Sequence, residues 1–205
     1  MSQALPAGSE KLILTNGEVS RFAGSHGLNT FAAAVYHVQN LPYGRTTERS
    51  DYRLVLSEGR GTCSSKHALL AALARENGLA VHLILGVYEM TEANTPGIGG
   101  ELSKHGLPSI PEAHCYLLVR DGVIDVTMPE GSPSGAERRF LREEAISPED
   151  ISTYKTAVHR RVLDDWLRAM GRDELELDGA WAIRDACIAA LSYPGPGPQQ
   201  EMQEP

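Results

Sequence analysis

The chain contains 205 residues, of which 41% are hydrophobic and 22% charged, and its formal net charge is -8. This length suits one domain with a sizeable core, since a domain takes roughly 150 residues. No apolar run approaches the ~20 residues of a membrane span, and a negative net charge disfavours a broad nucleic-acid surface, which depends on Lys and Arg.

Cysteine usage and the first residues indicate the compartment. Cys63, Cys115 and Cys187 are an odd number of cysteines in a chain too large to depend on disulfides, which favours a reducing environment. The first residues lack both the basic flank and the apolar stretch of a secretory signal. We therefore expect a cytoplasmic protein that does not contact a membrane.

The two ends of the chain differ in composition from the rest. Residues 193–205 are rich in Pro, Gly and Gln, and residues 1–8 also offer little to bury. We expect both segments to be mobile, because they have too few apolar side chains to pack. The working part is then one domain over residues 9–192.

Two helices are predicted in the first half of the chain. Apolar residues recur at helical spacing between Asn29, a suitable N-cap, and Pro42. A second helix begins at Cys63, is rich in Ala and Leu, and ends at Asn77-Gly78, where the glycine suits a left-handed cap. Its apolar composition predicts deep burial.

Strands and a long loop are predicted next. Residues 79–88 form a nearly unbroken apolar run, which is typical of a central strand covered on both faces. Residues 91–112 are crowded with Gly and Pro and lack periodicity, so we expect a loop. Residues 114–119 and 123–127 are strand-like runs separated by Arg120-Asp121-Gly122, which predicts a hairpin.

Two amphipathic helices are predicted near the end of the chain. Apolar residues recur at helical spacing over residues 158–170, with Gly171 as the stop, and over residues 181–191, with Asp178 at the start. Helices, antiparallel strands and further helices follow one another along the chain. This order predicts an α+β domain.

Cys63 occupies a position suited to nucleophilic chemistry. At the first turn of a helix, unpaired backbone N–H groups and the helix dipole favour a thiolate and can hold an oxyanion. Gly59 and Gly61 allow a sharp turn before it and leave room for a substrate carbonyl. A lone cysteine is more often a buried structural residue, so the interpretation depends on its potential partners.

His114 and Asp125 lie on the two strands of the predicted hairpin. With a turn at Asp121-Gly122, their odd separation puts both side chains on one face, as a histidine–carboxylate pair requires. The same register offsets them by about four residues, roughly 13 Å along the strands. We expect a bulge, or a strand that starts after His114, to close this gap and complete a triad with Cys63.

These features resemble the core of the transglutaminase-like superfamily. The segment GRGTCSSKHALLAALARENGLAVHLILGVY is similar to the family's glycine-x-cysteine helix and following strand. The segment AHCYLLVRDGVIDVT is similar to its histidine strand and its Asp-x-Thr strand. The resemblance covers residues 55–128 and departs from many members at Tyr116, where they carry tryptophan.

The resemblance implies a papain-like α+β fold, in which the nucleophile helix packs against a small antiparallel sheet and further helices follow. It gives Cys63 the role of nucleophile, His114 that of general base and acid, and Asp125 that of the orienting acid. The implied activity is that of a cysteine hydrolase or acyltransferase, without a cofactor, acting on a peptide, a protein or a small amide.

Two further sets of site residues are candidates. The resemblance implies an upstream aromatic or amide side chain that assists the oxyanion, for which Gln39, Asn40 and Tyr43 are near enough, although such residues more often end a helix. The loop at residues 91–112 is predicted to be a lid that sets specificity. In this lid, backbone freedom and apolar substrate contacts would come from Gly99, Gly100, Leu107 and Ile110.

Two other functions compete with catalysis. Cys63 and His67, one helical turn apart, could bind zinc with His114 or Cys115, but adjacent strand residues point to opposite faces and no C-x-x-C pair is present. A protein with this fold could also bind a ligand without turnover. Two charged pairs are interpreted as a solvated face: Arg138-Arg139 and Glu143-Glu144.

Overall fold

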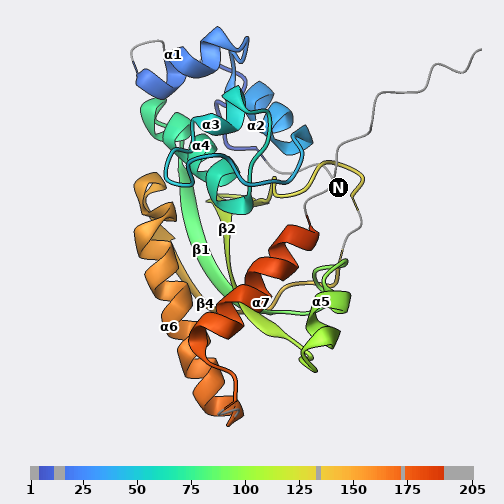
Figure 1. The fold of residues 1–205 in the computed structure, drawn as a ribbon. Helices are drawn as coiled ribbons and strands as arrows, with labels where there is room; N and C mark the ends of the chain where they lie inside the picture. The colour runs from blue at the N-terminus through green and yellow to red at the C-terminus, as the bar shows by residue number, and fades with distance from the viewer. Residues whose placement is uncertain (1–4, 12–16, 133–134, 172–173, 192–205) are drawn as a thin grey trace, which may run out of the picture.

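The computed structural model describes residues 5–11, 17–132, 135–171 and 174–191 (Figure 1). The described elements are, in chain order, α1 (Glu18–Ser25), α2 (Phe31–Asn40), α3 (Leu54–Ser57), α4 (Cys63–Glu76), β1 (Val81–Met90), α5 (Gly99–Lys104), β2 (Ile110–Val119), β3 (Gly122–Ile124), β4 (Phe140–Ile146), the 3-10 helix η1 (Pro148–Ile151), α6 (Thr153–Met170) and α7 (Leu177–Ala190). Residues 1–4 and 193–205, which were predicted to be mobile, lie outside the described residues, whereas Leu5 packs against the core. No helix among the described residues combines the length and apolar composition needed to cross a membrane.

The four strands form one antiparallel sheet in the order β3-β2-β1-β4. β1 lies inside the sheet and pairs with β2 from Val81 opposite Val119 to Met90 opposite Ile110. The predicted central strand and the α+β class are therefore confirmed. β4 was not predicted, because this edge strand carries charged side chains instead of an apolar run.

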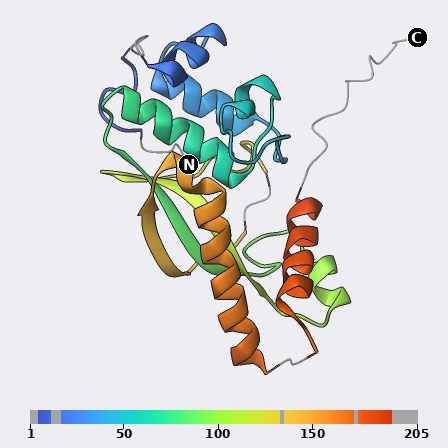
Figure 2. The same ribbon diagram turned by 60° about the vertical axis from the view of Figure 1, so that its left-hand side comes forward.

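The N-terminal helices pack together at one end of the sheet. α4 contacts α1, α2, β1 and β2, and it lies between the other helices and the sheet (Figures 1 and 2). Every residue from Ala68 to Ala74 is buried, which explains the Ala/Leu composition of α4. The helix predicted from Cys63 is confirmed. α2 begins one residue later than predicted, because the Thr30 hydroxyl accepts a hydrogen bond from Ala33 N at 3.1 Å.

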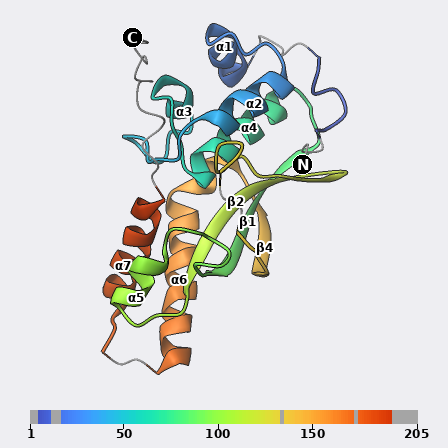
Figure 3. The same cartoon turned by 90° about the vertical axis from the view of Figure 1, so that its right-hand side faces the viewer.

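A second hydrophobic cluster joins the C-terminal helices to the far ends of β1 and β2. α6 packs on β2, α7 packs on α6, and α5 packs on α7 (Figure 3). Residues 91–112 contribute buried side chains to this cluster, namely Ile98, Leu102, Leu107 and Ile110.

The prediction of a loop without regular structure at residues 91–112 is therefore wrong. The segment contains α5, and its last residues begin β2. A helix of six residues is too short to produce a clear apolar period. The start of β2 was hidden by Pro111, a residue that cannot donate a backbone hydrogen bond to a sheet.

Gly86 makes space for an aromatic cluster beside His114. It lies opposite His114 in the pairing of β1 with β2, and a Cβ atom at Gly86 would lie 2.6 Å from the Phe140 ring. The Phe140 ring stacks on His114 and on Tyr116, with ring centroids 6.5 Å and 5.2 Å away. Because glycine has no side chain, these three rings can share one face of the sheet.

We expect Gly86→Ala to lower the free energy of unfolding by about 1–3 kcal/mol, because the added methyl group would overlap the Phe140 ring. Gly100→Ala is the matched control, since nothing lies within 4 Å of a Cβ added at this exposed residue of α5. The control should leave the free energy unchanged or raise it by up to ~1 kcal/mol. Urea unfolding measures the free energy of unfolding of both variants. Equal changes in the two variants would contradict the argument that a methyl group at Gly86 overlaps the Phe140 ring.

Candidate active site

The first turn of α4 positions Cys63. Cys63 is the first residue of this helix and is only 5% exposed. Gly61, just before the helix, donates a backbone hydrogen bond to Pro42 and accepts one from Gly44, both at 3.2 Å. The segment after α2 is therefore held against the N-terminus of α4, and the predicted position of Cys63 is confirmed.

The two glycines before Cys63 serve the local fold. Gly59 has a φ of 62°, in the left-handed region that favours glycine. A Cβ at Gly61 would lie 2.8 Å from the Lys66 side chain and 3.0 Å from that of Val55. Gly61 thus makes room for the protein's own side chains, not for a substrate carbonyl as predicted.

The hairpin differs from its prediction by one residue at the turn. β3 pairs only with the end of β2, from Leu117 opposite Ile124 to Val119 opposite Gly122, so the turn is Arg120-Asp121. This register would put Asp125 opposite Tyr116, on the face of the sheet that carries His114. The offset along the strands is two residues, about 7 Å.

The end of β3 closes the remaining distance between His114 and Asp125. β3 stops at Ile124, so Asp125 is free to leave the sheet, and its Oδ2 lies 2.8 Å from His114 Nε2. His114 is the fifth residue of β2 and does not open the strand as predicted. Neither a bulge nor a late strand start brings the pair together.

Hydrogen bonds to both oxygens hold the Asp125 carboxylate. Oδ1 accepts from Thr127 N at 3.0 Å and from Thr127 Oγ1 at 2.5 Å, and Oδ2 accepts from Arg138 Nη1 at 2.9 Å. Burial raises the pKa of Asp125, but His114, His67 and Arg138 bring it well below its ordinary value. The carboxylate is therefore ionised. The interpretation of Arg138 as part of a solvated face is wrong, and no local pattern marks its role.

His67 links the first turn of α4 to the segment after Asp125. Its Nε2 accepts from Val126 N at 2.8 Å, so its Nδ1 carries the proton and donates to the Cys63 carbonyl at 2.7 Å. Burial lowers the pKa of His67 to about 4, in keeping with this neutral ring. Zinc binding by His67 would break one of these two bonds, because each ring nitrogen already has a partner. Across the described part of the chain, no three His, Cys, Asp or Glu side chains form a metal-binding group.

Lys66 adds a second link to the same segment. It is fully buried, and its Nζ donates to the carbonyl oxygens of Leu41 at 2.6 Å and of Thr127 at 3.1 Å. Burial lowers its pKa to about 8, while the charges of Asp125 and Cys63 act in the opposite direction. Lys66 and His67, two consecutive residues of α4, thus fix where Asp125 lies relative to Cys63.

Cys63 and His114 carry opposite charges near neutral pH. Burial raises the pKa of Cys63, but the charge of Lys155 and the hydrogen bond and charge of His114 outweigh it, and the pKa falls to about 6. Burial lowers the pKa of His114, but Asp125 and Cys63 raise it to about 9. Because His114 Nε2 is bonded to Asp125, Nδ1 is the nitrogen available to the thiolate.

Lys155 is a site residue that the sequence reasoning missed. It lies in α6, 92 residues after Cys63, and its Nζ is 3.9 Å from Cys63 Sγ and 2.5 Å from Ser64 Oγ. Burial lowers the pKa of Lys155, but the charges of Cys63, Cys115 and Glu112 outweigh burial. The pKa lies above its ordinary value, so the amine is charged. The available signal was weak: Lys155 lies three residues before Val158, in line with the apolar stripe of the predicted helix but ahead of its first residue.

Comparison with known proteins agrees with this geometry. Residues 20–121 match the family model of the transglutaminase-like superfamily. This part of the chain belongs to that superfamily. The match includes Cys63 and His114 and ends before Asp125. The chain has no match among curated proteins and none among solved structures.

The architecture around the transglutaminase-like segment is consistent with a papain-like fold. The described residues form seven α-helices and a four-stranded antiparallel sheet, and α4 packs on β1 and β2. At the departure from the family pattern, the Tyr116 ring stacks near His114 with ring centroids 6.3 Å apart, and its hydroxyl donates to Glu143. An aromatic ring therefore remains beside the histidine of the transglutaminase-like core.

The three candidates for oxyanion assistance differ in position. Tyr43 and Gln39 line the cleft that contains Cys63, and Asn40 does not. Burial raises the pKa of Tyr43 well above its ordinary value, so its hydroxyl keeps its proton and can donate it in a hydrogen bond. Asn40 instead donates to the Tyr36 carbonyl at 2.8 Å and ends α2, which corrects its assignment.

The four residues predicted to form a substrate lid lie elsewhere. Leu107 and Ile110 are 5% and 0% exposed in the second hydrophobic cluster. Gly99 and Gly100 belong to α5, and none of the four lines a cavity at Cys63. Their prediction is corrected, because α5 packs against α7. Of the same segment, residues 94–96 do line the cleft.

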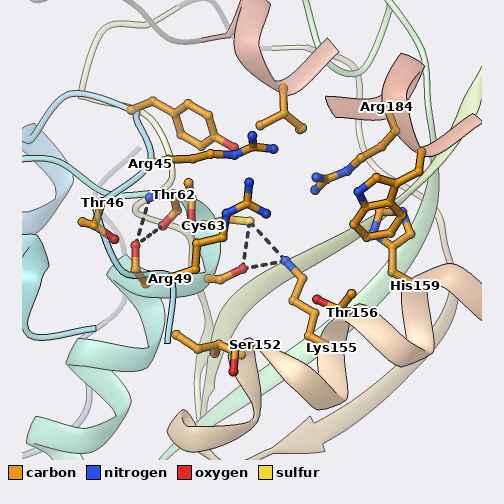
Figure 4. Close-up of a pocket in the computed structure, with 16 residues that line it drawn as sticks. Arg45, Thr46, Arg49, Thr62, Cys63, Ser152, Lys155, Thr156, His159 and Arg184 are labelled. Atoms are coloured by element: carbon orange, nitrogen blue, oxygen red, sulfur yellow. Dashed lines mark hydrogen bonds between the residues drawn. The ribbon is translucent and has the colours of Figure 1, made fainter. Parts of the chain in front are cut away.

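Two cavities of the transglutaminase-like site meet at Cys63. The first is a cleft of about 1090 Å³ that contains His114, Asp125, Tyr116 and Arg138. The second is a pocket of about 120 Å³ between the segment after α2 and the helices α6 and α7 (Figure 4). Cys63 and Tyr43 line both cavities.

We expect Lys155→Met to raise the pKa of Cys63, because burial remains while an attraction that lowers the pKa is lost. The rate of iodoacetamide alkylation of Cys63, followed by peptide mass spectrometry, should have a midpoint near pH 6 in the wild type. In the variant the rate at this pH should fall about tenfold.

Lys104→Met is the control, since this exposed lysine of α5 pairs with Glu101 and lines neither cavity. Cys115 and Cys187 serve as internal standards, because burial raises their pKa to about 12 and about 11. An unchanged midpoint in a folded Lys155→Met protein would contradict the role of the lysine.

Proposed function

We propose that the protein is a thiol-dependent enzyme that cleaves an amide or peptide bond through Cys63, His114 and Asp125, with water or an amine as the acyl acceptor. The observation that carries the proposal is the charged pair, in which the pKa of Cys63 is about 6 and that of His114 about 9. Burial raises the pKa of all three cysteines, but at Cys115 and Cys187 nearby positive charge does not outweigh it, and their pKa values stay above that of an ordinary thiol. Membership of residues 20–121 in the transglutaminase-like superfamily supports the same class of reaction.

The first half of the proposed reaction forms a thioester. The Cys63 thiolate attacks the carbonyl carbon of the substrate, and an electron pair moves to the carbonyl oxygen. N–H groups in the first turn of α4 and the Tyr43 hydroxyl are the candidate donors to this oxyanion. The oxyanion then collapses, the C–N bond breaks, and the His114 imidazolium gives its proton to the leaving nitrogen.

The second half releases the acyl group. Neutral His114 takes a proton from water or from an amine, which attacks the thioester. The C–S bond breaks and the Cys63 thiolate is restored, so that water yields a carboxylic acid and an amine yields a new amide. Asp125 stays ionised and keeps Nδ1 of His114 directed at the thiol throughout.

Two substitutions test the triad with p-nitrophenyl acetate as acyl donor. We expect Cys63→Ala to abolish release of p-nitrophenolate beyond the uncatalysed rate. Asp125→Asn should lower kcat/KM by about 10³ to 10⁴, because the acid orients the histidine without reacting. Asp121→Asn, the same change in the exposed turn of the hairpin, is the matched control and should be silent.

Mass spectrometry of the quenched reaction should find one acetyl group on the Cys63 peptide. A silent Asp125→Asn variant would show that another group orients His114. If Cys63 is readily alkylated but esters, peptides and amides never acylate it, the protein is a binding module without turnover.

The pH dependence of kcat/KM should report the charged pair. Activity should rise through about pH 6 as Cys63 ionises and, for an amide such as an acyl p-nitroanilide, fall through about pH 9 as His114 loses the proton that the leaving nitrogen needs. With p-nitrophenyl acetate, the alkaline decline should be weak, because p-nitrophenolate leaves without a proton. A rise centred near the ordinary thiol pKa would contradict the ion pair.

A further inference from the structure

The small pocket beside Cys63 is lined by positive charge. Its walls contain no carboxylate side chain, and its cationic side chains are Arg45, Arg49, Lys155 and Arg184. In Figure 4 these side chains point toward the same space next to Cys63. The whole chain has a net charge of -8, so a pocket lined by four cations and no carboxylate differs from the average charge of the protein.

Nearby carboxylates offset only part of this charge. Arg184 donates to Glu112 through Nε at 2.5 Å and Nη2 at 2.6 Å, and through Nη1 to Asp185 at 2.9 Å. Arg45 Nη2 donates to the same Asp185 oxygen at 2.6 Å. Two carboxylates and the Cys63 thiolate thus lie beside four cations, which leaves an excess of one positive charge at the pocket, and of two when Cys63 is protonated or replaced.

Arg49, like Lys155, forms no ion pair with a carboxylate among the described residues. Burial and the charges of Arg45 and Arg184 lower its pKa, while Asp185 acts in the opposite direction. Like charges held together in this way repel one another, and a bound anion would relieve the repulsion. The conformation of the free protein is therefore prepared for a negatively charged group.

The arginines have little part in activating the nucleophile. The charges that act most strongly on the Cys63 thiol are those of Lys155, His114 and Glu112. Lys155 already lies against Cys63, whereas Arg45 and Arg49 come from the segment after α2, and Arg184 comes from α7. Activation of the thiol therefore does not account for three guanidinium groups at one pocket, and planar guanidinium groups suit carboxylates and phosphates.

We propose that this pocket binds a carboxylate or phosphate group of the acyl substrate, close to the carbonyl that Cys63 attacks. The volume of about 120 Å³ admits a group of a few heavy atoms but not a polypeptide segment. The wide cleft on the other side of Cys63 receives the rest of the substrate. Only the placement of the carbonyl at Cys63 rests on the proposed function.

The pocket also explains a role for the C-terminal helices. Lys155 comes from α6 and Arg184 from α7, and both helices lie outside the residues that match the transglutaminase-like family. These helices complete a recognition site against a core that carries Cys63 and His114. Substrate choice by charge is thus added to the family reaction by residues beyond the matched segment.

Two alkylating reagents of similar size test the charge of the pocket. Iodoacetate and iodoacetamide attack the same thiolate, but only iodoacetate carries a carboxylate. At constant ionic strength, Arg49→Gln and Arg45→Gln should each lower the ratio of the iodoacetate rate to the iodoacetamide rate at Cys63 by about three- to tenfold. Arg161→Gln, at an exposed residue of α6 outside the pocket, is the matched control and should keep the wild-type ratio.

Binding of small anions tests the pocket without the thiol. Malonate and inorganic phosphate should each bind the Cys63→Ala protein in isothermal titration calorimetry, and uncharged malonamide should not. Arg49→Gln in the same background should weaken anion binding about three- to tenfold. Stronger binding of malonate would assign the pocket to a carboxylate, and stronger binding of phosphate to a phosphate ester.

The outcomes separate this proposal from the proposed function. Anion binding to Cys63→Ala that depends on Arg49 supports the pocket even if no acyl substrate is ever turned over. Conversely, an active enzyme that binds neither anion, and whose alkylation ratio is unchanged by Arg45→Gln and Arg49→Gln, would overturn the pocket and leave the triad intact.

Discussion

Burial raises the pKa of a thiol, so Cys63 can ionise near neutral pH only because positive charge lies beside it. Two groups from distant parts of the chain supply that charge, His114 on β2 and Lys155 on α6. His114 can hold its proton in the same buried region because Asp125 is bonded to its ring. Cys63, His114, Asp125 and Lys155 form one electrostatic unit, and a change at any member alters the ionisation of the others.

The position of Asp125 depends on where the sheet stops. β3 ends at Ile124, and the chain then crosses toward α4, where Lys66 and His67 hold the Thr127 carbonyl and the Val126 N–H. These bonds run from the same helix that begins with Cys63. Cys63 and Asp125, the proposed nucleophile and orienting acid, are therefore both held in place by α4, although Asp125 itself lies in an irregular segment after a short strand.

According to our two proposals, the catalytic residues and the residues that recognise the substrate anion come largely from different parts of the chain. The transglutaminase-like segment contains Cys63 and His114, while α6 and α7 add Lys155 and Arg184. Lys155 belongs to both parts, since it contacts the Cys63 sulfur and also lines the cationic pocket. A substrate anion bound in this pocket would lie within the field that stabilises the thiolate, so binding and nucleophile activation would be coupled.

Local sequence patterns were sufficient for α4, for β1 and for Cys63 at a helix start, because caps and apolar periodicity act over a few residues. They also predicted His114 and Asp125 on one face of the sheet. The odd separation of the two positions in the hairpin gives this result even when the two-residue turn is misplaced by one residue. Local patterns could not predict the end of β3, the bond of Arg138 to Asp125, or the position of Lys155 beside Cys63. Those features depend on contacts between segments far apart in the chain, and packing alone determines which charged side chains leave the solvent and which charges they meet.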